Sequence, residues 1–330
     1  MSDRTPTLRR DGIAVTKERL YRRLVAGCAL LTLFVTAGII LALLGETLVF
    51  FSEVSFVEYV TGTDWSPLIG EETYGVLPLV SGTLIVTLVS ALIALPVGLA
   101  IAIYLSEYAS NRVRSVLKPA LEILAGVPTV IYGYFALVYL TPILDGPLPI
   151  SVPVLPAGFP VVPEFTLVVP SLRTFNVLSA SIVVGLMIIP MVSSISEDAL
   201  SAVPDSLRNA AYGLGSTKFD VSTKVVVPAA TSGIVSSYVL AISRAIGETM
   251  AVTIAAGQSP KIPSFPNVFE NLAQSTQTIT AAMVQIANAE SRGGAVFEAM
   301  FALGMTLFVI TLVMNVFAEY IRRYYREEYS

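Results

Sequence analysis

Long apolar segments alternate with charged loops along the chain. A helix needs about 20 predominantly apolar residues to cross a bilayer, and six segments reach that length. They are Leu24–Gly45, Tyr74–Ser106, Ile123–Leu144, Thr174–Ser196, Pro228–Gly257 and Ala299–Ala318. The segment Pro228–Gly257 contains Arg244 and Glu248, whereas the other segments carry no charge. The pattern therefore predicts an all-α integral membrane protein with six transmembrane helices.

The first two segments are expected to differ from a plain spanning helix. Leu24–Gly45 lies where a signal peptide would, but its apolar core is too long and we find no small-x-small cleavage site after it. We therefore expect this segment to be retained as a helix. Tyr74–Ser106 is longer than one crossing needs, and its first part, with Pro78, Ser81 and Gly82, is predicted to lie at the membrane surface.

Lys and Arg residues concentrate in alternate connecting segments, and such residues favour the cytoplasmic side. The basic segments are the tail 1–23, the loop around Arg112–Lys118, the loop 197–227 and the tail 319–330. The loop 46–73 is acidic instead and has no basic residue; its acids are Glu46, Glu53, Glu58, Asp64, Glu71 and Glu72. The loop 145–173 is rich in Pro, which fixes φ and removes amide donors, so we expect an extended external segment and not a helix. It is either an ordered cover or a passive linker. We expect a multi-pass protein of the plasma membrane with both termini in the cytoplasm.

Composition supports a membrane protein and limits its chemistry. The chain is 54% hydrophobic and 13% charged, whereas soluble domains carry about 25% charged residues. It has no His, which removes the commonest metal ligand and the usual proton shuttle. The single cysteine, Cys28, allows no disulfide within the chain. We expect neither a metal site nor catalytic residues, because no nucleophile and base pair is visible.

The cytoplasmic loop contains the segment Asn209–Pro228, which reads NAAYGLGSTKFDVSTKVVVP. An acid at Asp205 suits the start of a short helix, because it complements the helix dipole. The pair Ala210 and Ala211 would give this helix a slim face that fits a groove on a partner. Gly215 can take a positive φ and end the helix. The loop is therefore predicted to be a lever that passes a push from a partner protein into the membrane, and an ordinary helical loop is the alternative.

ATP is expected to bind elsewhere than on this chain. The sequence has no phosphate-cradling G-x-x-x-x-G-K-[ST] motif. The segment from Gly213 to Lys218 is faintly similar, but the order of its residues is wrong. Any ATP that drives this protein would therefore have to be hydrolysed on a partner subunit.

Arg244 and Glu248 form the second candidate site. Charged residues within a membrane segment are costly and by default mark functional sites. Arg244 is predicted near the middle of the fifth helix, with Glu248 at i+4 on the same face. In the functional interpretation, Arg244 offers positive potential to a passing anion and Glu248 holds the guanidinium in place. The alternative is a structural pair that neutralises itself.

Several motifs together resemble the phosphate ABC transporter permeases of the Pst system. They are Gly75–Leu84, Ala125–Tyr134, the cytoplasmic loop and Arg244–Val252. The last motif and Asp64–Pro67 are most similar to the PstC subunit. The likeness runs from about Phe50 to Ala318.

The cytoplasmic loop itself resembles the loop with which ABC-importer permeases dock onto their ATPase. The Ala-Ala pair, Gly215 and the apolar-x-apolar-Pro step that ends at Pro228 have the family's spacing. Asn209 is a departure, because the family usually has Glu there. The resemblance therefore assigns ATPase coupling to Asn209, Ala210, Ala211, Gly215 and Pro228, with the charge at the first position in question.

The resemblance also implies the architecture and the partners. It implies a type I importer (MetI-like) fold with a permease domain at 74–318. A PstC-like and a PstA-like permease would form the pathway, two PstB-like ATPase subunits would bind ATP and Mg, and a PstS-like protein would deliver phosphate from outside. This chain would then hold no cofactor. The alternatives are the PstA-type paralogue, a permease for sulfate or molybdate, and a stand-alone channel or secondary transporter.

Overall fold

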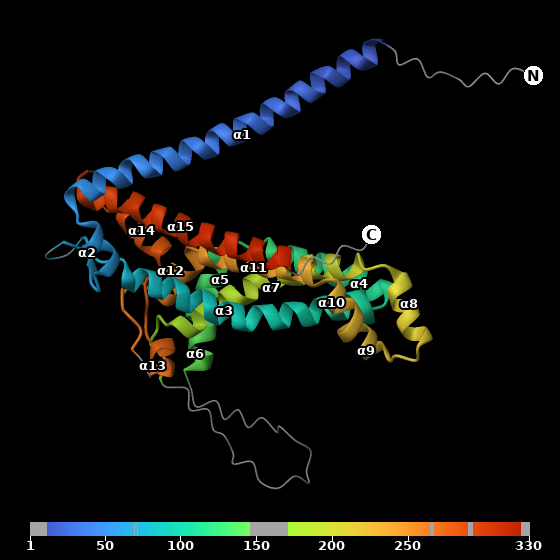
Figure 1. Cartoon of the computed structure of the whole chain (residues 1–330). Coiled ribbons are helices and arrows are strands. Elements are labelled where there is room, and N and C mark those ends of the chain that lie inside the picture. The colour runs from blue at the N-terminus through green and yellow to red at the C-terminus, as the bar shows by residue number, and fades with distance from the viewer. Residues whose placement is uncertain are drawn as a thin grey trace, which may run out of the picture.

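Two long helices, α3 (Leu77–Ile103) and α7 (Val177–Ser201), lie side by side at the centre of the structure (Figure 1). The computed structural model describes residues 12–68, 70, 72–145, 171–264, 267–289 and 293–324. Small residues allow the two helices to approach closely. A Cβ at Gly98 would lie 2.6 Å from the side chain of Val192, so the absence of a side chain at Gly98 is what lets Val192 of α7 pack against α3. Ser90 Oγ donates a hydrogen bond of 2.9 Å to the carbonyl of Ser181.

The spanning segments match the six predicted from the sequence. Among the described residues, four helical stretches are long and apolar enough to cross a membrane: Lys17–Glu53, Leu77–Tyr108, Val177–Ser201 and Ala295–Ile321. Two further pairs qualify as broken spans: Asn111–Ala125 with Thr129–Leu144, bent by 87°, and Lys218–Ala229 with Thr231–Ile246, bent by 71°. The chain is therefore a multi-pass membrane protein with up to six spans.

The third span, predicted within Ile123–Leu144, begins earlier, at Asn111, and is broken. It consists of α4 (Asn111–Ala125) and, after a break, α5 (Thr129–Phe135), the π-helical turn η2 (Ala136–Leu140) and α6 (Thr141–Leu144). The break contains Pro128, whose ring disfavours a helical conformation of the residue before it. The composition of the segment stays apolar through the break, so its hydropathy could not show it.

The start of α3 is part of one continuous helix, in which Pro78 and Gly82 are buried against neighbouring elements. The predicted position of this part at the membrane surface stays a prediction. Pro78 lies in the first turn of the helix, where its missing amide hydrogen costs little. A Cβ at Gly82 would lie 2.3 Å from the carbonyl oxygen of Gln277, so this glycine allows the chain before α14 (Ile279–Ala287) to cross close to α3.

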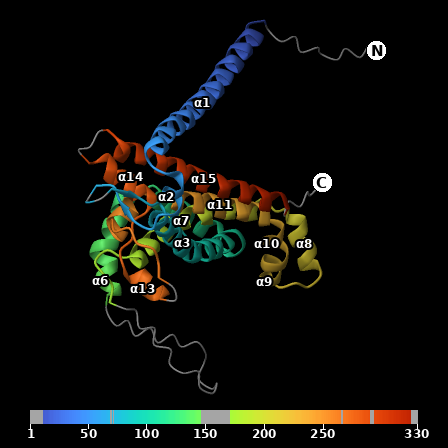
Figure 2. The same cartoon turned by 60° about the vertical axis from the view of Figure 1, so that its left-hand side comes forward.

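Aromatic side chains join the first helix to the last at one end of the molecule. α1 (Gly12–Glu53) meets α15 (Ala295–Tyr324) there and diverges from the bundle toward its own start (Figures 1 and 2). Phe50 contacts Tyr59 and Tyr74 edge to face, at ring distances of 5.6 and 5.4 Å. Tyr59 belongs to α2 (Phe56–Thr61), and its hydroxyl lies 2.8 Å from Thr306 Oγ1 on α15. The short strands β1 (Trp65–Ser66) and β2 (Thr73–Tyr74) complete the cluster.

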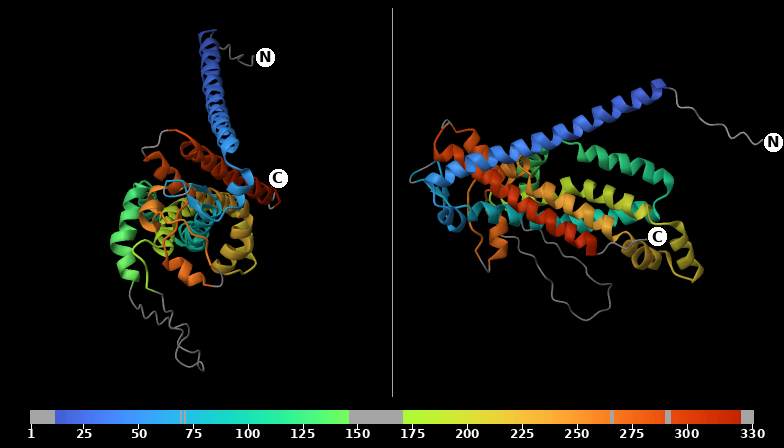
Figure 3. Two further views of the ribbon diagram at one scale, coloured as in Figure 1. Left: turned by 90° about the vertical axis from the view of Figure 1, so that its left-hand side faces the viewer. Right: turned by 45° about the horizontal axis from the view of Figure 1, so that its top comes forward.

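The cytoplasmic loop predicted at 197–227 forms the other end of the molecule. There α3 continues into the π-helical turn η1 (Tyr104–Tyr108), and α7 is followed by α8 (Asp205–Gly213). The chain returns through α9 (Lys218–Val221), the π-helical turn η3 (Ser222–Val226) and α10 (Val227–Ala229). The right view of Figure 3 shows this yellow hairpin at the end of the bundle opposite to the light-blue α2.

The segment predicted as the fifth span, Pro228–Gly257, is divided as well. It contains the end of α10, then α11 (Thr231–Ile246), which belongs to the bent pair above, and then α12 (Met250–Ala256), which lies beyond that pair; α13 (Val268–Ala273) follows. A single helix from Pro228 to Gly257 was predicted, and the structure breaks it at Ala230 and again at 247–249. The loop predicted at 145–173 lies mostly outside the described residues, but its two ends meet where Leu172 N donates to Asp145 Oδ1 at 2.9 Å.

Candidate functional site

Gly215, two residues beyond the end of α8, terminates that helix, as the sequence predicts. The glycine has φ +85°, a left-handed conformation that suits a residue without a Cβ. Its amide donates to the carbonyl of Tyr212 at 2.9 Å, and the amide of Ser216 donates to the carbonyl of Ala211 at 3.1 Å. These two bonds form a Schellman motif, which satisfies the last carbonyls of a helix. The turn therefore fixes the direction in which the chain leaves α8.

Replacing Gly215 by Ala is expected to destabilise this turn without any steric clash. No atom lies within 4 Å of a Cβ at that position, so the cost comes from the backbone alone, about 1–2 kcal/mol for a left-handed residue. We expect the variant to reach the membrane and to unfold at a temperature a few degrees lower. Thermal unfolding of the purified chain measures this, with Gly213→Ala as the control, because Gly213 is helical and also has open space. An equal loss of stability in both variants would contradict the prediction.

The two alanines of the loop lie on different sides of α8. Successive residues of a helix are turned by about 100°, so neighbours cannot share one face. Ala211 is buried in a cluster with Leu200, Val221 and Val226, whereas Ala210 is exposed. The expectation of one slim face made by both alanines was therefore wrong. Asn209, next to Ala210, is also exposed. Of the three consecutive residues predicted to contact a partner, Asn209 and Ala210 are therefore open to it and Ala211 is not.

Two apolar side chains that the sequence analysis did not single out extend this open surface. Leu214 is 89% exposed at the end of α8, and Phe219 is 66% exposed on α9. We call Asn209, Ala210, Leu214 and Phe219 the coupling surface. Its signal in the sequence was a large apolar residue between two glycines, Leu214, and another between two charged residues, Phe219.

Arg208 fixes α8 to both central helices. Its guanidinium donates to Glu107 Oε1 in η1, with Nη2 at 3.0 Å and Nε at 3.4 Å. It also donates to the carbonyl of Leu200 at 2.8 Å and to that of Val203 at the end of α7. A cation is favoured there because the C-terminus of a helix carries partial negative charge. Both charged side chains are largely buried, 14% and 5% exposed, so α8 is held in place and cannot swing freely.

Pro228 lies inside the returning helical segment and not in a loop. It belongs to α10, immediately before the 71° bend that leads into α11. Thr231 Oγ1 donates to the carbonyl of Pro228 at 2.8 Å, so a side chain takes up one of the carbonyls freed at the bend. Pro228 is not part of the coupling surface, and its role in coupling stays a prediction.

Arg244 and Glu248 are not on one helical face. Helix α11 ends at Ile246, so Arg244 lies in its last turn and Glu248 lies in the break before α12. Glu248 Oε1 accepts a hydrogen bond of 3.1 Å from the amide of Ala251 and so caps α12. Within the described part of the chain, no acidic side chain forms an ion pair with Arg244, and its side chain is exposed. The self-neutralising pair is therefore wrong, and so is the expected role of Glu248 in holding the guanidinium.

The break between α11 and α12 is buried at Glu248 and exposed at Gly247. Glu248 is 8% exposed, and its carbonyl accepts a hydrogen bond of 2.8 Å from Thr280 on α14. Irregular backbone at membrane depth is tolerated where it is buried in protein or lines a water-filled cavity. This break presents a cationic side chain, Arg244, on one side and a buried cap, Glu248, on the other.

Known proteins with similar sequences are transport permeases. Residues 94–327 match the family described as "Binding-protein-dependent transport system inner membrane component". The phosphate transport system permease protein PstC of Mesorhizobium japonicum is 32% identical, covering 97% of this chain and 93% of the relative. PstC of Haemophilus influenzae is 33% identical, covering 91% of each. The probable ABC transporter permease YqgH of Bacillus subtilis is 32% identical, covering 91% of this chain and 89% of that protein.

Solved structures share the fold at low sequence identity. A chain of the bacterial ABC transporter involved in alginate import has a TM-score of 0.57 at 15% identity, covering 94% of this chain and 100% of the other. A chain of the methionine ABC transporter MetNI has a TM-score of 0.52 at 14% identity, covering 77% and 95%. The all-α, MetI-like fold predicted from the sequence is thereby confirmed. The chain belongs to the family of binding-protein-dependent transport system inner membrane components, as a PstC-like permease of the ABC importer type.

Proposed function

We propose that this permease imports phosphate, as one half of a translocation pathway driven by ATP hydrolysis on another subunit. The similarity to PstC proteins supports the substrate. The observation that carries the coupling is the attachment of α8: Arg208 binds it to the ends of α3 and α7, and the coupling surface stays open beside that attachment. A force applied to α8 would therefore move two spanning helices together.

The partners follow from this proposal. A PstA-like permease completes the pathway, a pair of PstB-like ATPase subunits binds ATP and Mg and contacts α8 from the cytoplasm, and a PstS-like protein delivers phosphate outside. This chain is then a non-catalytic subunit without a cofactor, and both of its termini are cytoplasmic. The acidic loop 46–73 repels a free anion, which favours delivery by a docked carrier over capture from solution.

Arg244 is proposed to attract the anion within the membrane. Its charge is not neutralised by a neighbouring acid in the described residues, and its exposure within the single chain suits a position facing the pathway. A guanidinium stays charged and matches the oxygens of phosphate in geometry. The coupling surface is proposed to meet the ATPase through Asn209 and Ala210, with Gly215 setting its shape, Ala211 anchoring it from below and Pro228 marking the return to the membrane.

Competition between anions tests the substrate. The complex is reconstituted into proteoliposomes with the three partners, and uptake of labelled phosphate is measured with excess unlabelled phosphate, sulfate or molybdate. Of the three unlabelled anions, only phosphate should suppress the uptake of labelled phosphate. Suppression by sulfate or molybdate, together with their own ATP-driven uptake, would assign the permease to another oxyanion.

A further inference from the structure

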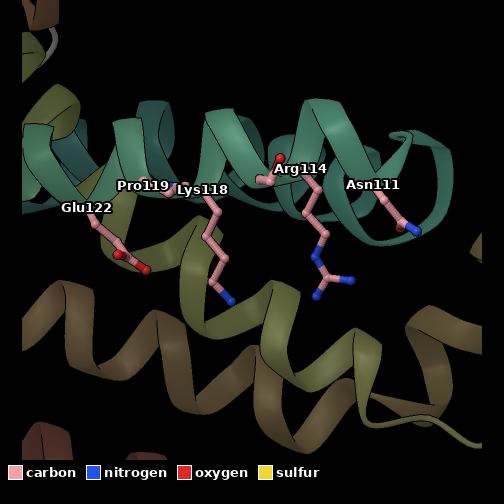
Figure 4. Close-up of a pocket in the computed structure, with 6 residues that line it drawn as sticks. Asn111, Arg114, Lys118, Pro119 and Glu122 are labelled. Carbon is pink, nitrogen blue, oxygen red and sulfur yellow. The ribbon is translucent and has the colours of Figure 1, made fainter.

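Helix α4 is attached to the bundle by ion pairs. Every residue of α4, all of them described, is at least partly exposed. Its Arg114 and Lys118 both reach Glu197 on α7, with Lys118 Nζ 2.6 Å from Glu197 Oε2. Figure 4 shows the two basic side chains pointing from α4 toward α7. An open groove lies along the same face of α4, lined by Asn111, Arg114, Ser115, Lys118, Pro119 and Glu122. Since no residue of α4 is buried, we take the ion pairs to Glu197 as the contacts that fix the helix on α7.

Glu197 is the buried centre of this attachment. Its side chain is fully buried, whereas Arg114 and Lys118 are 37% and 26% exposed. Ser201 Oγ donates to Glu197 Oε1 at 3.0 Å and completes its set of donors. The neighbouring Asp198 accepts from the same Lys118 at 2.7 Å but is 64% exposed, so water screens that pair.

The same cluster adjoins the attachment of α8. Ser106 Oγ on η1 donates to Glu107 Oε1 at 3.1 Å, and that carboxylate is the one that binds Arg208. Ser106 Oγ also lies 3.5 Å from Ser201 Oγ, which bonds Glu197. Polar contacts therefore run from α8 across the ends of α3 and α7 to α4.

At its other end, α4 is braced against α5. The two helices meet at a bend of 87°, and the hydroxyl of Tyr132 on α5 donates to the carbonyl of Leu124 on α4 at 2.9 Å. Helix α5 then packs directly on α12, because a Cβ at Gly133 would lie 2.9 Å from the Cα of Ala251. The amide of Ala251 is the one that Glu248 caps. A displacement of α4 would therefore reach the break in the fifth span.

We infer that Glu197 is a positioning residue that makes α4 move with α8 and so connects the coupling surface to the break between α11 and α12. This inference rests on the proposed function. Without the buried carboxylate, α4 keeps its sequence and helicity but loses its fixed place on α7. The two cations can then turn to water, since both are already partly exposed.

The test compares Glu197→Gln with Asp198→Asn in the full complex in proteoliposomes, by the amount of phosphate imported per ATP hydrolysed. Asp198→Asn is the matched control, because it removes the adjacent carboxylate from the same lysine. We expect Glu197→Gln to hydrolyse ATP while import per ATP falls about tenfold, within the usual range of coupling between sites. Asp198→Asn should import as much phosphate per ATP as the unaltered complex. If the two variants import equal amounts of phosphate per ATP, the inference is overturned.

Spin labels give a readout that does not depend on transport. Labels at Val116 on α4 and Val313 on α15, both exposed, are placed in a Cys28→Ser background. Glu197→Gln should broaden their distance distribution, and Asp198→Asn should not. If Glu197→Gln fails to assemble, Tyr132→Phe is measured in its place. This variant removes the hydrogen bond to the carbonyl of Leu124 but keeps the aromatic ring. Coupling retained in Tyr132→Phe would then overturn the inference. Absence of ATP-driven phosphate uptake in the unaltered complex would instead contradict the proposed function.

Discussion

Replacing Arg244 by Gln is expected to lower ATP-driven phosphate uptake by about 10- to 100-fold while the complex still assembles. A hydrogen bond to a charged group contributes about 1.5–3 kcal/mol, and each 1.4 kcal/mol corresponds to about a factor of ten. Gln retains hydrogen-bonding capacity but removes the positive potential. Because Arg244 is exposed within the chain and forms no ion pair in its described part, its loss leaves no buried partner charge behind.

Two companion variants separate charge from structure. Arg244→Lys keeps the charge without the planar fork and should retain part of the uptake. Glu248→Gln keeps an oxygen that can accept from Ala251 N, so it should impair uptake less than Arg244→Gln does. Initial rates of labelled phosphate uptake are compared at equal amounts of assembled complex. Uptake at the original rate in Arg244→Gln would remove Arg244 from the pathway.

Replacing Leu214 and Phe219 by Asp is expected to abolish binding of the ATPase. Full burial of one such side chain contributes about 1.5–3 kcal/mol, so each loss should weaken binding about 10- to 100-fold. Both side chains are open in the single chain, at 89% and 66% exposure, so neither change should disturb its own folding. Binding of the purified ATPase to the permease in detergent gives the affinity directly.

Conservative changes at the same positions are the matched controls. Leu214→Met and Phe219→Leu keep an apolar side chain and should bind the ATPase nearly as well as the unaltered permease. If the Asp variants also bind with unchanged affinity, the ATPase contacts another part of the protein. The coupling surface would then be wrong even where the rest of the fold is right.

Apolar length and turn chemistry were enough to predict the spans and the end of α8. The charge-free segments Tyr74–Ser106 and Thr174–Ser196 became α3 and α7, because a segment of that length and composition has few other folds open to it. Gly215 could be identified because only a residue without a Cβ takes φ +85° at no cost. Both signals are local in the sequence.

The missed features depend on contacts between distant residues. Arg208 lies 101 positions from Glu107, and Arg114 lies 83 from Glu197, so no local pattern connects them. The break after Ile246 was missed for a different reason. Gly247-Glu-Thr contains no proline, and its apolar flanks preserve the appearance of one helix. The i+4 spacing of Arg244 and Glu248 then indicated a shared face that does not exist.

The central claim is that this chain transmits force from an ATPase and does not move phosphate alone. Labelled phosphate uptake into proteoliposomes tests it, with the chain alone, with its partner permease, and with the full complex in the presence or absence of hydrolysable ATP. We predict uptake only for the full complex with ATP and the binding protein. Rapid phosphate movement through the chain alone, or uptake by the full complex without ATP, would contradict the account.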